Sequence, residues 1–223
     1  MNKEQHILDS WKINAPHWIE VIEGNAIESR RLATNNAIIT AVVNARPGTV
    51  LDIGCGEGWL AKELSTRGMQ VTGVDAISEL IEKARQKCPG NFITASYQEI
   101  AGNHILGENK FDAIVINFAL ISKESTEELL MALPSLLNTH GNLFIQTLHP
   151  HNRKAIEDYK TGWKAGSWDG LGDKFTEPYD WYFRTTEDWL LLLEKSGFQQ
   201  LKTTDVLHPQ SGALLSIIFE CEV

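Results

Sequence analysis

The strongest constraint on the fold lies in residues 49–75, where two apolar segments enclose a glycine-rich turn and a helical pattern. Residues 50–53 predict a short buried strand, residues from about 57 to 67 predict a helix, and residues 70–74 predict a second strand that runs into Asp75. Two strands joined by a helix usually lie parallel in one sheet, because the helical crossover returns the chain to the end of the sheet at which the first strand began. Such crossovers are almost always right-handed, which limits the possible topologies. This unit therefore predicts an α/β fold with helices on both faces of a parallel sheet.

The same alternation continues along the chain. It predicts further strands over residues 91–95, 111–117 and 142–147, and the strand over 111–117 is apolar between its ends, as parallel strands tend to be. The tail differs, because strand-like segments near residues 198–206 and 213–221 are joined by a short polar loop. We expect this last pair to form an antiparallel hairpin at the sheet edge.

Apolar residues at helical spacing predict the remaining elements. Helices are expected over residues 4–23, 27–45, 124–137 and 185–196. Pro16 is expected to interrupt the first of these, and residues 46–48 should end the second. A further helix starts near Ser78, which is a candidate N-cap residue.

We expect a single domain over residues 1–223, because no linker, repeat or low-complexity tract divides the chain. Its parts would be a helical cap over residues 1–48, a core over 49–147, an aromatic segment over 148–184, and a helix with the terminal hairpin over 185–223.

The aromatic segment fits neither helical nor strand spacing over residues 149–183. Its aromatic side chains are Trp163, Trp168, Phe175, Tyr179, Trp181, Tyr182 and Phe183. Long irregular segments inside compact domains are usually lids or binding loops, and ligand pockets favour aromatic walls. We interpret the segment as a lid; the alternative is a satellite hydrophobic cluster that covers the core.

Charge and cysteine content narrow the classes of partner. The formal net charge is -9, which argues against nucleic-acid binding because phosphate neutralisation requires a basic face. Cys55, Cys88 and Cys221 suggest neither a zinc pair nor a disulfide framework. Residues 1–10 are polar, and no apolar run is long enough to span a bilayer. We expect a cytoplasmic protein without a membrane partner, and the sequence indicates no oligomeric state.

The glycine-rich turn suggests a ligand site. Gly54 and Gly56 permit a tight turn and let a ligand approach the backbone, while free amides before the next helix suit a polar or negative ligand group. Asp75 follows Gly54 by 21 residues, and a carboxylate there can accept both hydroxyls of a ribose. The spacing departs from that of dinucleotide-binding proteins, because the third glycine is Gly58 and Trp59 occupies its usual place.

These motifs resemble those of class I S-adenosylmethionine-dependent methyltransferases, closely over residues 49–147 and loosely in the flanks. The resemblance implies a Rossmann-like, mainly parallel seven-stranded sheet with an antiparallel edge strand, helices on both faces, and an N-terminal helical cap over the cofactor. It also implies that the range from Gly54 through Cys55 to Gly56 lies against the methionine part of S-adenosylmethionine, with Asp52 nearby. Asp75 would hold the ribose, and Ala76 would lie beside the adenine.

Two further motifs support the resemblance unequally. The family often has an aspartate after the third strand to bond the adenine amino group, whereas this chain has Ser96, followed by Tyr97 as a wall for the ring. The fourth strand matches better, and Asn117 and Phe118 at its end would face the cofactor.

An arginine is the expected partner of the cofactor carboxylate, because its guanidinium binds carboxylates in a bidentate manner. Arg30 and Arg31 precede the sheet, and we choose Arg30 as the candidate. The alternative for either residue is a solvated charge on a helix face.

The chemistry itself requires little of the side chains. Methyl transfer is a direct displacement, so proximity and alignment can supply much of the rate, and a base is needed only where the acceptor must lose a proton. His149, at the end of the fifth strand, is the candidate base; the alternative is a histidine that merely caps the strand. His149 and His151 lack a third ligand at suitable spacing, so no metal is expected.

The acceptor is expected to be a small molecule that accepts methyl at oxygen, nitrogen or carbon. Enzymes that methylate nucleic-acid amino groups have a motif like Asn-Pro-Pro-Tyr at the end of strand four. Only its asparagine, Asn117, is present here. The chain is most similar to ubiquinone-type and other small-molecule methyltransferases. Two alternatives stay open: a methyltransferase-like module that binds cofactor without catalysis, and an NAD-dependent dehydrogenase.

Overall fold

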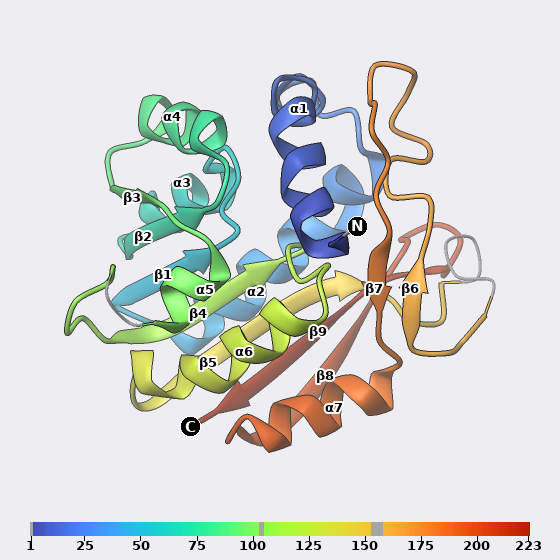
Figure 1. Ribbon diagram of the computed structural model, residues 1–223. Coiled ribbons are helices and arrows are strands. Elements are labelled where there is room, and N and C mark those ends of the chain that lie inside the picture. Colours follow the sequence, from blue (N-terminus) through green and yellow to red (C-terminus); the bar gives the residue numbers. More distant parts are fainter. Residues whose placement is uncertain (1, 103–104, 153–157) are drawn as a thin grey trace.

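The computed structural model describes residues 2–102, 105–152 and 158–223, and its centre is a seven-stranded sheet (Figure 1). The strands are β1 (Thr49–Ile53), β2 (Gln70–Asp75), β3 (Asn91–Thr94), β4 (Phe111–Asn117), β5 (Leu137–Leu148), β8 (Gln199–Leu207) and β9 (Leu214–Glu222). Their order is β3-β2-β1-β4-β5-β9-β8. The first five are parallel, and β9 runs antiparallel to both β5 and β8. The predicted sheet, with its antiparallel pair at one edge, is confirmed.

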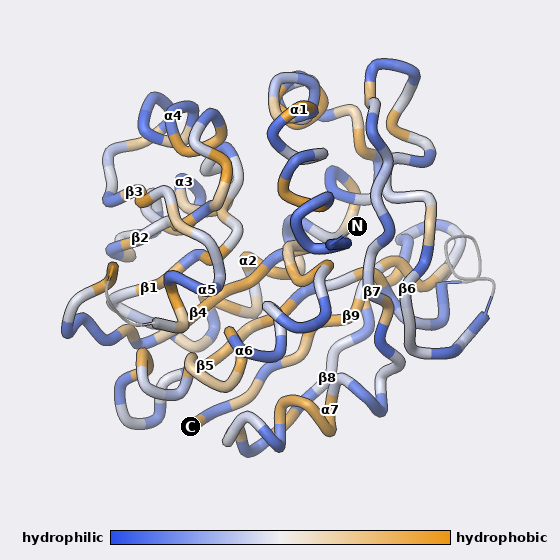
Figure 2. The backbone as a smooth tube through the Cα atoms, viewed as in Figure 1, coloured by the Kyte–Doolittle hydropathy of each residue, from blue (hydrophilic) through white to orange (hydrophobic). Residues whose placement is uncertain are grey.

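Helices cover both faces of this sheet. They are α1 (Lys3–Glu23), α2 (Asn35–Ala45), α3 (Trp59–Ser65), α4 (Ser78–Lys87), α5 (Tyr97–Ala101), α6 (Glu124–Ala132) and α7 (Thr186–Lys195), together with the π-helix η1 (Arg30–Thr34) and the 3-10 helix η2 (Leu133–Leu136). One apolar cluster packs α5, α6 and α7 on one face, and a second packs α2, α3 and α4 on the other. The central strands β4 and β5 are hydrophobic through the middle of the molecule, because both of their faces are covered (Figure 2).

Two local expectations are wrong. Helix α1 runs through Pro16 without a break. Asn2 caps its N-terminus, and the helix is held by packing because Asn14 and Ala15 are buried. Ser78 is the first residue of α4 rather than its cap, since Ile77 occupies the cap position. The Asp75 carboxylate accepts the Ile77 amide instead, at 2.9 Å.

Residues 153–157 of the aromatic segment lie outside the described residues. In its described part, β6 (Gly162–Lys164) and β7 (Trp181–Phe183) form a small antiparallel ribbon outside the main sheet. Hydrogen bonds tie the segment to α1, which lies between it and α4 (Figure 1). The Trp168 indole donates to Ser10 Oγ at 2.9 Å, and the Trp11 indole donates to Tyr179 Oη at 3.0 Å. Residues of the segment and of α1 thus form one hydrophobic cluster. The role of the segment as a lid stays a prediction.

Among the described residues, no helix has both the length and the apolar character needed to cross a membrane.

Candidate active site

A cavity of about 740 Å³ lies at the carboxyl ends of β1, β2 and β4, beneath α1 and the aromatic segment. This edge is where open α/β sheets bind ligands. Ten of the twelve residues singled out in the sequence line the cavity: Arg30, Gly54, Cys55, Gly56, Asp75, Ala76, Ser96, Tyr97, Asn117 and Phe118. The other two, Asp52 and His149, do not line it.

The glycines of the turn serve different purposes. Gly54 and Gly58 have positive φ and pack tightly, because a Cβ at Gly54 would lie 2.3 Å from the Cβ of Ala119 and one at Gly58 would lie 2.8 Å from that of Ala84. Gly56 also has positive φ, but the nearest atom to a Cβ there would be 3.9 Å away. Gly56 lines the cavity, so it is the position at which an absent side chain leaves room for a ligand.

The sequence suggested free amides in this turn, but three of them are already hydrogen-bonded within the protein. Those of Gly54 and Cys55 both donate to the Val74 carbonyl, at 2.7 and 3.1 Å. The Gly56 amide donates to Asp75 Oδ2 at 2.9 Å. These three amides thus bond the turn to the end of β2.

Asp75 is fixed at the cavity wall by two amides. Oδ2 accepts from Gly56 and Oδ1 accepts from Ile77, both at 2.9 Å. Each carboxylate oxygen keeps a lone pair for another donor, as two ribose hydroxyls would require. Burial raises the pKa of Asp75 to about 6, although its two backbone hydrogen bonds act to lower it.

Asp52 lies under the turn with a buried carboxylate. Its Oδ2 has no hydrogen-bond partner among the described residues. Burial raises the pKa of Asp52 to about 8, and the nearby charges of Asp75 and Glu57 add to the effect. Glu57 is also buried and pairs with Lys87 at 3.1 Å. A cationic ligand nearby would stabilise the charged forms of Asp52, Asp75 and Glu57.

Arg30, on the π-helix η1, places its guanidinium at the wall of the first cavity. Its centre lies 4.8 Å from the ring centroid of Trp59 and 5.8 Å from that of Trp18. Burial lowers its pKa, and Nη2 is buried without a partner among the described residues. A guanidinium donor held in this way suits a carboxylate. Arg31 is exposed and lines neither large cavity.

Asn117 and Phe118 end β4 beside the turn. The Asn117 Oδ1 is buried and has no partner in the described part of the chain. Phe118 has a φ of 55°, a left-handed conformation that is strained for a bulky residue. Its amide donates to the Gln146 carbonyl at 2.7 Å, which holds the strained residue at the cavity. Unpartnered atoms of Arg30, Asp52 and Asn117 thus cluster in and under one cavity, and an amino acid moiety would satisfy them.

Ser96 and Tyr97 are committed to protein contacts. Ser96 Oγ donates to Glu99 Oε2 at 2.7 Å and accepts the Glu99 amide at 3.3 Å, so it caps α5. Tyr97 Oη donates to the Ala119 carbonyl at 2.8 Å, and burial raises its pKa. Ser96 is therefore a structural cap at the rim, whereas the Tyr97 ring forms part of the cavity wall.

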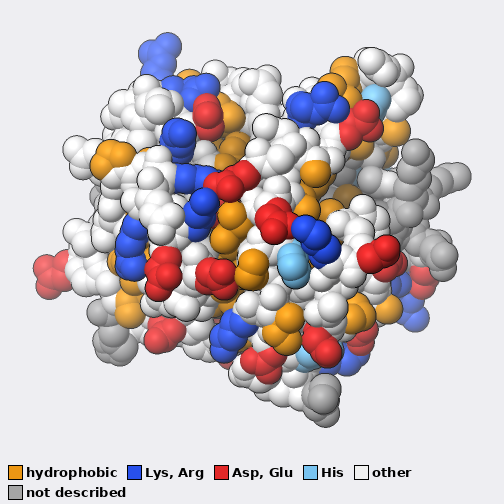
Figure 3. All heavy atoms as spheres, turned by 90° about the horizontal axis from the view of Figure 1, so that it is seen from above, with side chains coloured by type: hydrophobic (Ala, Val, Ile, Leu, Met, Phe, Trp, Pro, Cys, Tyr) orange, Lys and Arg blue, Asp and Glu red, His pale blue; other side chains and the backbone are white. Residues whose placement is uncertain are grey.

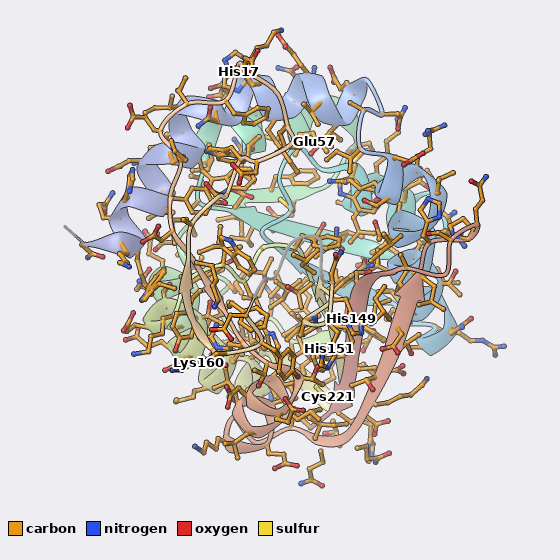
Figure 4. All side chains as sticks on the ribbon, turned by 90° about the vertical axis from the view of Figure 1, so that its right-hand side faces the viewer. His17, Glu57, His149, His151, Lys160 and Cys221 are labelled. Carbon is orange, nitrogen blue, oxygen red and sulfur yellow. The ribbon has the colours of Figure 1, made fainter. Side chains whose placement is uncertain are left out.

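His149 lies away from both large cavities. Its Nε2 is 3.2 Å from Asp205 Oδ1, and its Nδ1 accepts the His151 amide at 3.0 Å, so both ring nitrogens are engaged. His149 and His151 lie together, well apart from Glu57 of the glycine turn (Figure 4). The structure therefore places His149 where a strand-end cap would lie.

A second cavity, of about 730 Å³, adjoins the first. The residues shared by the two are Phe118, Ile121, Leu148, Ser167, Asp169 and Tyr179. Most of its other lining residues belong to the aromatic segment and the start of α7. The sequence predicted that this segment contributes aromatic walls, but its position at the junction follows from its attachment to α1.

Sequence reasoning missed several residues of the first cavity. Trp18 and Trp59 flank Arg30, and Glu57 lies under the turn. Trp59 carried a signal, since it stands where a dinucleotide-binding protein has its third glycine. Trp18 carried none, because a tryptophan on an amphipathic helix is indistinguishable from a core residue in sequence.

A profile of the methyltransferase domain family matches residues 27–203. The chain belongs to the class I S-adenosylmethionine-dependent methyltransferases. The match spans the glycine turn and the main sheet except for β9 and the end of β8, and it includes Arg30.

Among curated relatives, the ubiquinone biosynthesis O-methyltransferase of Glaesserella parasuis is 32% identical over 106 residues, covering 45% of each chain. The enzyme of that name from Rickettsia felis is 23% identical over 154 residues, covering 66% of this methyltransferase and 62% of the relative. The chain thus matches only about half to three fifths of the length of these relatives.

Solved structures share the fold at low identity. A Thermotoga maritima methyltransferase, described as a possible histamine N-methyltransferase, has a TM-score of 0.69 at 18% identity and covers 95% of this chain and 99% of its own. The magnesium protoporphyrin IX methyltransferase of Synechocystis, with bound S-adenosylmethionine, has a TM-score of 0.55 at 22% identity and covers 83% of this chain and 74% of its own.

Proposed function

We propose that this methyltransferase binds S-adenosylmethionine in the first cavity and transfers its methyl group to a small molecule in the second. The observation that carries the proposal is the junction of two cavities of similar volume at Phe118, beside the glycine turn. One cavity has the size and polar atoms for an amino acid joined to a nucleoside, and the other leaves space for an acceptor beside it.

Unpartnered polar atoms assign the cofactor groups to walls of the first cavity. Arg30 would hold the carboxylate, while Asn117 Oδ1 and Asp52 Oδ2, both without a partner among the described residues, would favour the ammonium group. Asp75 would accept the ribose hydroxyls. Ala76 and the Tyr97 ring would lie against the adenine, and Ser96 would border it.

When bound, the cofactor supplies an electrophilic methyl group on a sulfonium. The chain's own contribution is to position an acceptor in line with that group and to exclude water. Phe118, Leu148 and Tyr179 form an apolar and aromatic boundary at the junction, which suits both tasks. With both ring nitrogens of His149 engaged, the proposal assigns no base role to that residue.

A non-catalytic module is the second candidate, and it requires a blocked acceptor space. The three tryptophans that could block it do not, since Trp168 lines the first cavity, Trp181 lines the second, and Trp163 lines neither. The second cavity keeps its volume of about 730 Å³ beside the glycine site. This favours an enzyme over a cofactor sensor.

Small molecules fit the second cavity better than nucleic acid does. Acidic and basic side chains are interspersed on the face seen in Figure 3, without a continuous basic surface. One relative is named an O-methyltransferase, and one structural neighbour is described as a possible N-methyltransferase. Membership of the family therefore does not fix which atom accepts the methyl group.

The direct test is calorimetric titration with S-adenosylhomocysteine and, separately, NADH, followed by a screen of phenols, amines and carboxylates for S-adenosylhomocysteine release. Binding of S-adenosylhomocysteine alone, and turnover of at least one small acceptor, are expected. Binding of NADH instead would contradict the proposed cofactor. Cofactor binding without any turnover would favour the non-catalytic module.

A further inference from the structure

The charges around the second cavity are the basis for inferring what it accepts. Among the described residues, its charged lining side chains are Asp158, Lys164, Asp169 and Arg184. Formal charges cancel in this set, so the identity of the ligand depends on which of the four already has a partner.

Arg184 is neutralised within the protein. Its side chain is only 2% exposed, and Nη2 lies 3.1 Å from Glu127 Oε1. Its other hydrogen bonds go to the carbonyls of Ser122 and Lys123, both at 3.0 Å. The guanidinium also lies over the Tyr182 ring, 4.6 Å from its centroid. Arg184 is therefore bound to the start of α6 and is not a free site for an anion.

Lys164 has a carboxylate close by as well. Its Nζ lies 3.8 Å from Asp158 Oδ2 and 5.7 Å from the centroid of the Phe183 ring. Both cations of the cavity thus have an acidic neighbour, and an anionic acceptor would have to displace one of these partners.

Asp169 is the exception, because its carboxylate has no ion pair or side-chain hydrogen bond among residues 2–102, 105–152 and 158–223. It lines both cavities and so lies at their junction, where the other shared polar side chains are the neutral Ser167 and Tyr179. Its backbone is fixed by the preceding Trp168, which is buried against Trp11 at a ring distance of 4.9 Å.

We propose that the acceptor is a small primary or secondary amine that enters as its ammonium ion, and that Asp169 is the residue that binds this cation. The inference rests on the proposed methyl transfer and names its substrate class. The aromatic side chains of Tyr179, Trp181 and Phe183 line the same cavity, and the faces of aromatic rings attract organic cations. The net charge of -9 also favours the approach of cations over anions.

The reaction balances with these groups alone. The ammonium gives one proton to the Asp169 carboxylate, which is exposed and can pass it to solvent. The freed nitrogen lone pair forms a bond to the methyl carbon while the carbon–sulfur bond breaks, and its electron pair stays on sulfur. The products are the methylated ammonium ion, S-adenosylhomocysteine and a released proton, so each side carries two positive charges.

The test compares acceptors that differ only in the head group. Benzylamine, 2-phenylethylamine and their N-methyl forms are assayed beside the alcohol and the carboxylate of the same skeletons. We expect turnover of amines only. We expect Asp169→Asn to raise the amine KM by about tenfold or more, the ratio for losing one charge-assisted hydrogen bond, with S-adenosylhomocysteine affinity unchanged. Asp169→Glu keeps the carboxylate and should raise the amine KM less than Asp169→Asn does.

Asp173→Asn is the matched control, because Asp173 lies in the same segment and is exposed but lines neither cavity. Equal amine KM values for Asp169→Asn and Asp173→Asn would overturn the inference. So would turnover of the alcohols or carboxylates without the amines, or retained S-adenosylhomocysteine binding with no amine turned over. Failure to bind S-adenosylhomocysteine would instead contradict the proposed function itself.

Discussion

Replacing Asp52 by asparagine should stabilise the cofactor-free protein in a pH-dependent way. The pKa of Asp52 is raised to about 8 in the folded chain because the carboxyl is buried, whereas an unfolded chain would have the ordinary value of 3.8. The folded state therefore holds this proton more tightly. Its contribution to stability is complete below pH 3.8 and is lost as the pH rises toward 8.

The size of the effect follows from the same two values. pH 7 lies about three units above the ordinary pKa of 3.8. At about 1.36 kcal/mol per unit, the wild type loses about 4 kcal/mol of its free energy of unfolding by pH 7, and Asp52→Asn does not. At pH 5 the corresponding difference is about 2 kcal/mol or less. Asparagine keeps the shape of the side chain, so packing should change little.

Urea unfolding of both proteins at pH 5, 6, 7 and 8, without cofactor, measures this difference. Subtracting one curve from the other removes the contributions of groups common to both, including Asp75 with its pKa of about 6. The stability advantage of the variant should grow with pH up to about 8. A constant difference across this range would refute the reasoning that Asp52 is held protonated by burial.

Three further predictions, made with five substitutions, test the cofactor site and its glycine turn. Arg30→Gln should weaken S-adenosylhomocysteine binding by about 1.5–3 kcal/mol, the range for a hydrogen bond to a charged group, while Arg31→Gln should leave calorimetric affinity unchanged; equal effects would remove Arg30 from the site. Asp75→Ala should weaken binding by a similar amount, about 1.5–3 kcal/mol, and an unchanged dissociation constant would rule out its ribose contact. Gly54→Ala should destabilise the fold by about 1–3 kcal/mol through overpacking, whereas Gly56→Ala should reduce cofactor affinity more than stability; thermal melts and titrations that rank the two the other way would contradict these roles.

The strands of the sheet were accessible from sequence because each strand carries its own signal. The run from Phe111 to Asn117 is apolar between its ends, and the structure assigns those same seven residues to β4. The local errors arose where tertiary contacts override local rules. Pro16 lies inside a helix that is capped and packed, and Ile77 occupies the cap position because Asp75 accepts its amide.

Most residues that line the first cavity were also predictable, because short motifs fix backbone positions at the strand ends. Predictions of which hydrogen-bonding groups remain free were less successful. Ser96 and His149 have suitable chemistry, but Glu99 and Asp205 already engage them. Spacing along the chain gives no information on such partners. Asp169 escaped notice for the opposite reason, since only the packing of its segment on α1 brings it to the junction.

The measurement closest to the central claim is a crystal structure of the protein with S-adenosylhomocysteine. The account predicts the ribose hydroxyls on Asp75, the carboxylate on Arg30 and the sulfur facing the second cavity past Phe118. A nucleoside bound elsewhere, or a sulfur directed away from that cavity, would contradict it.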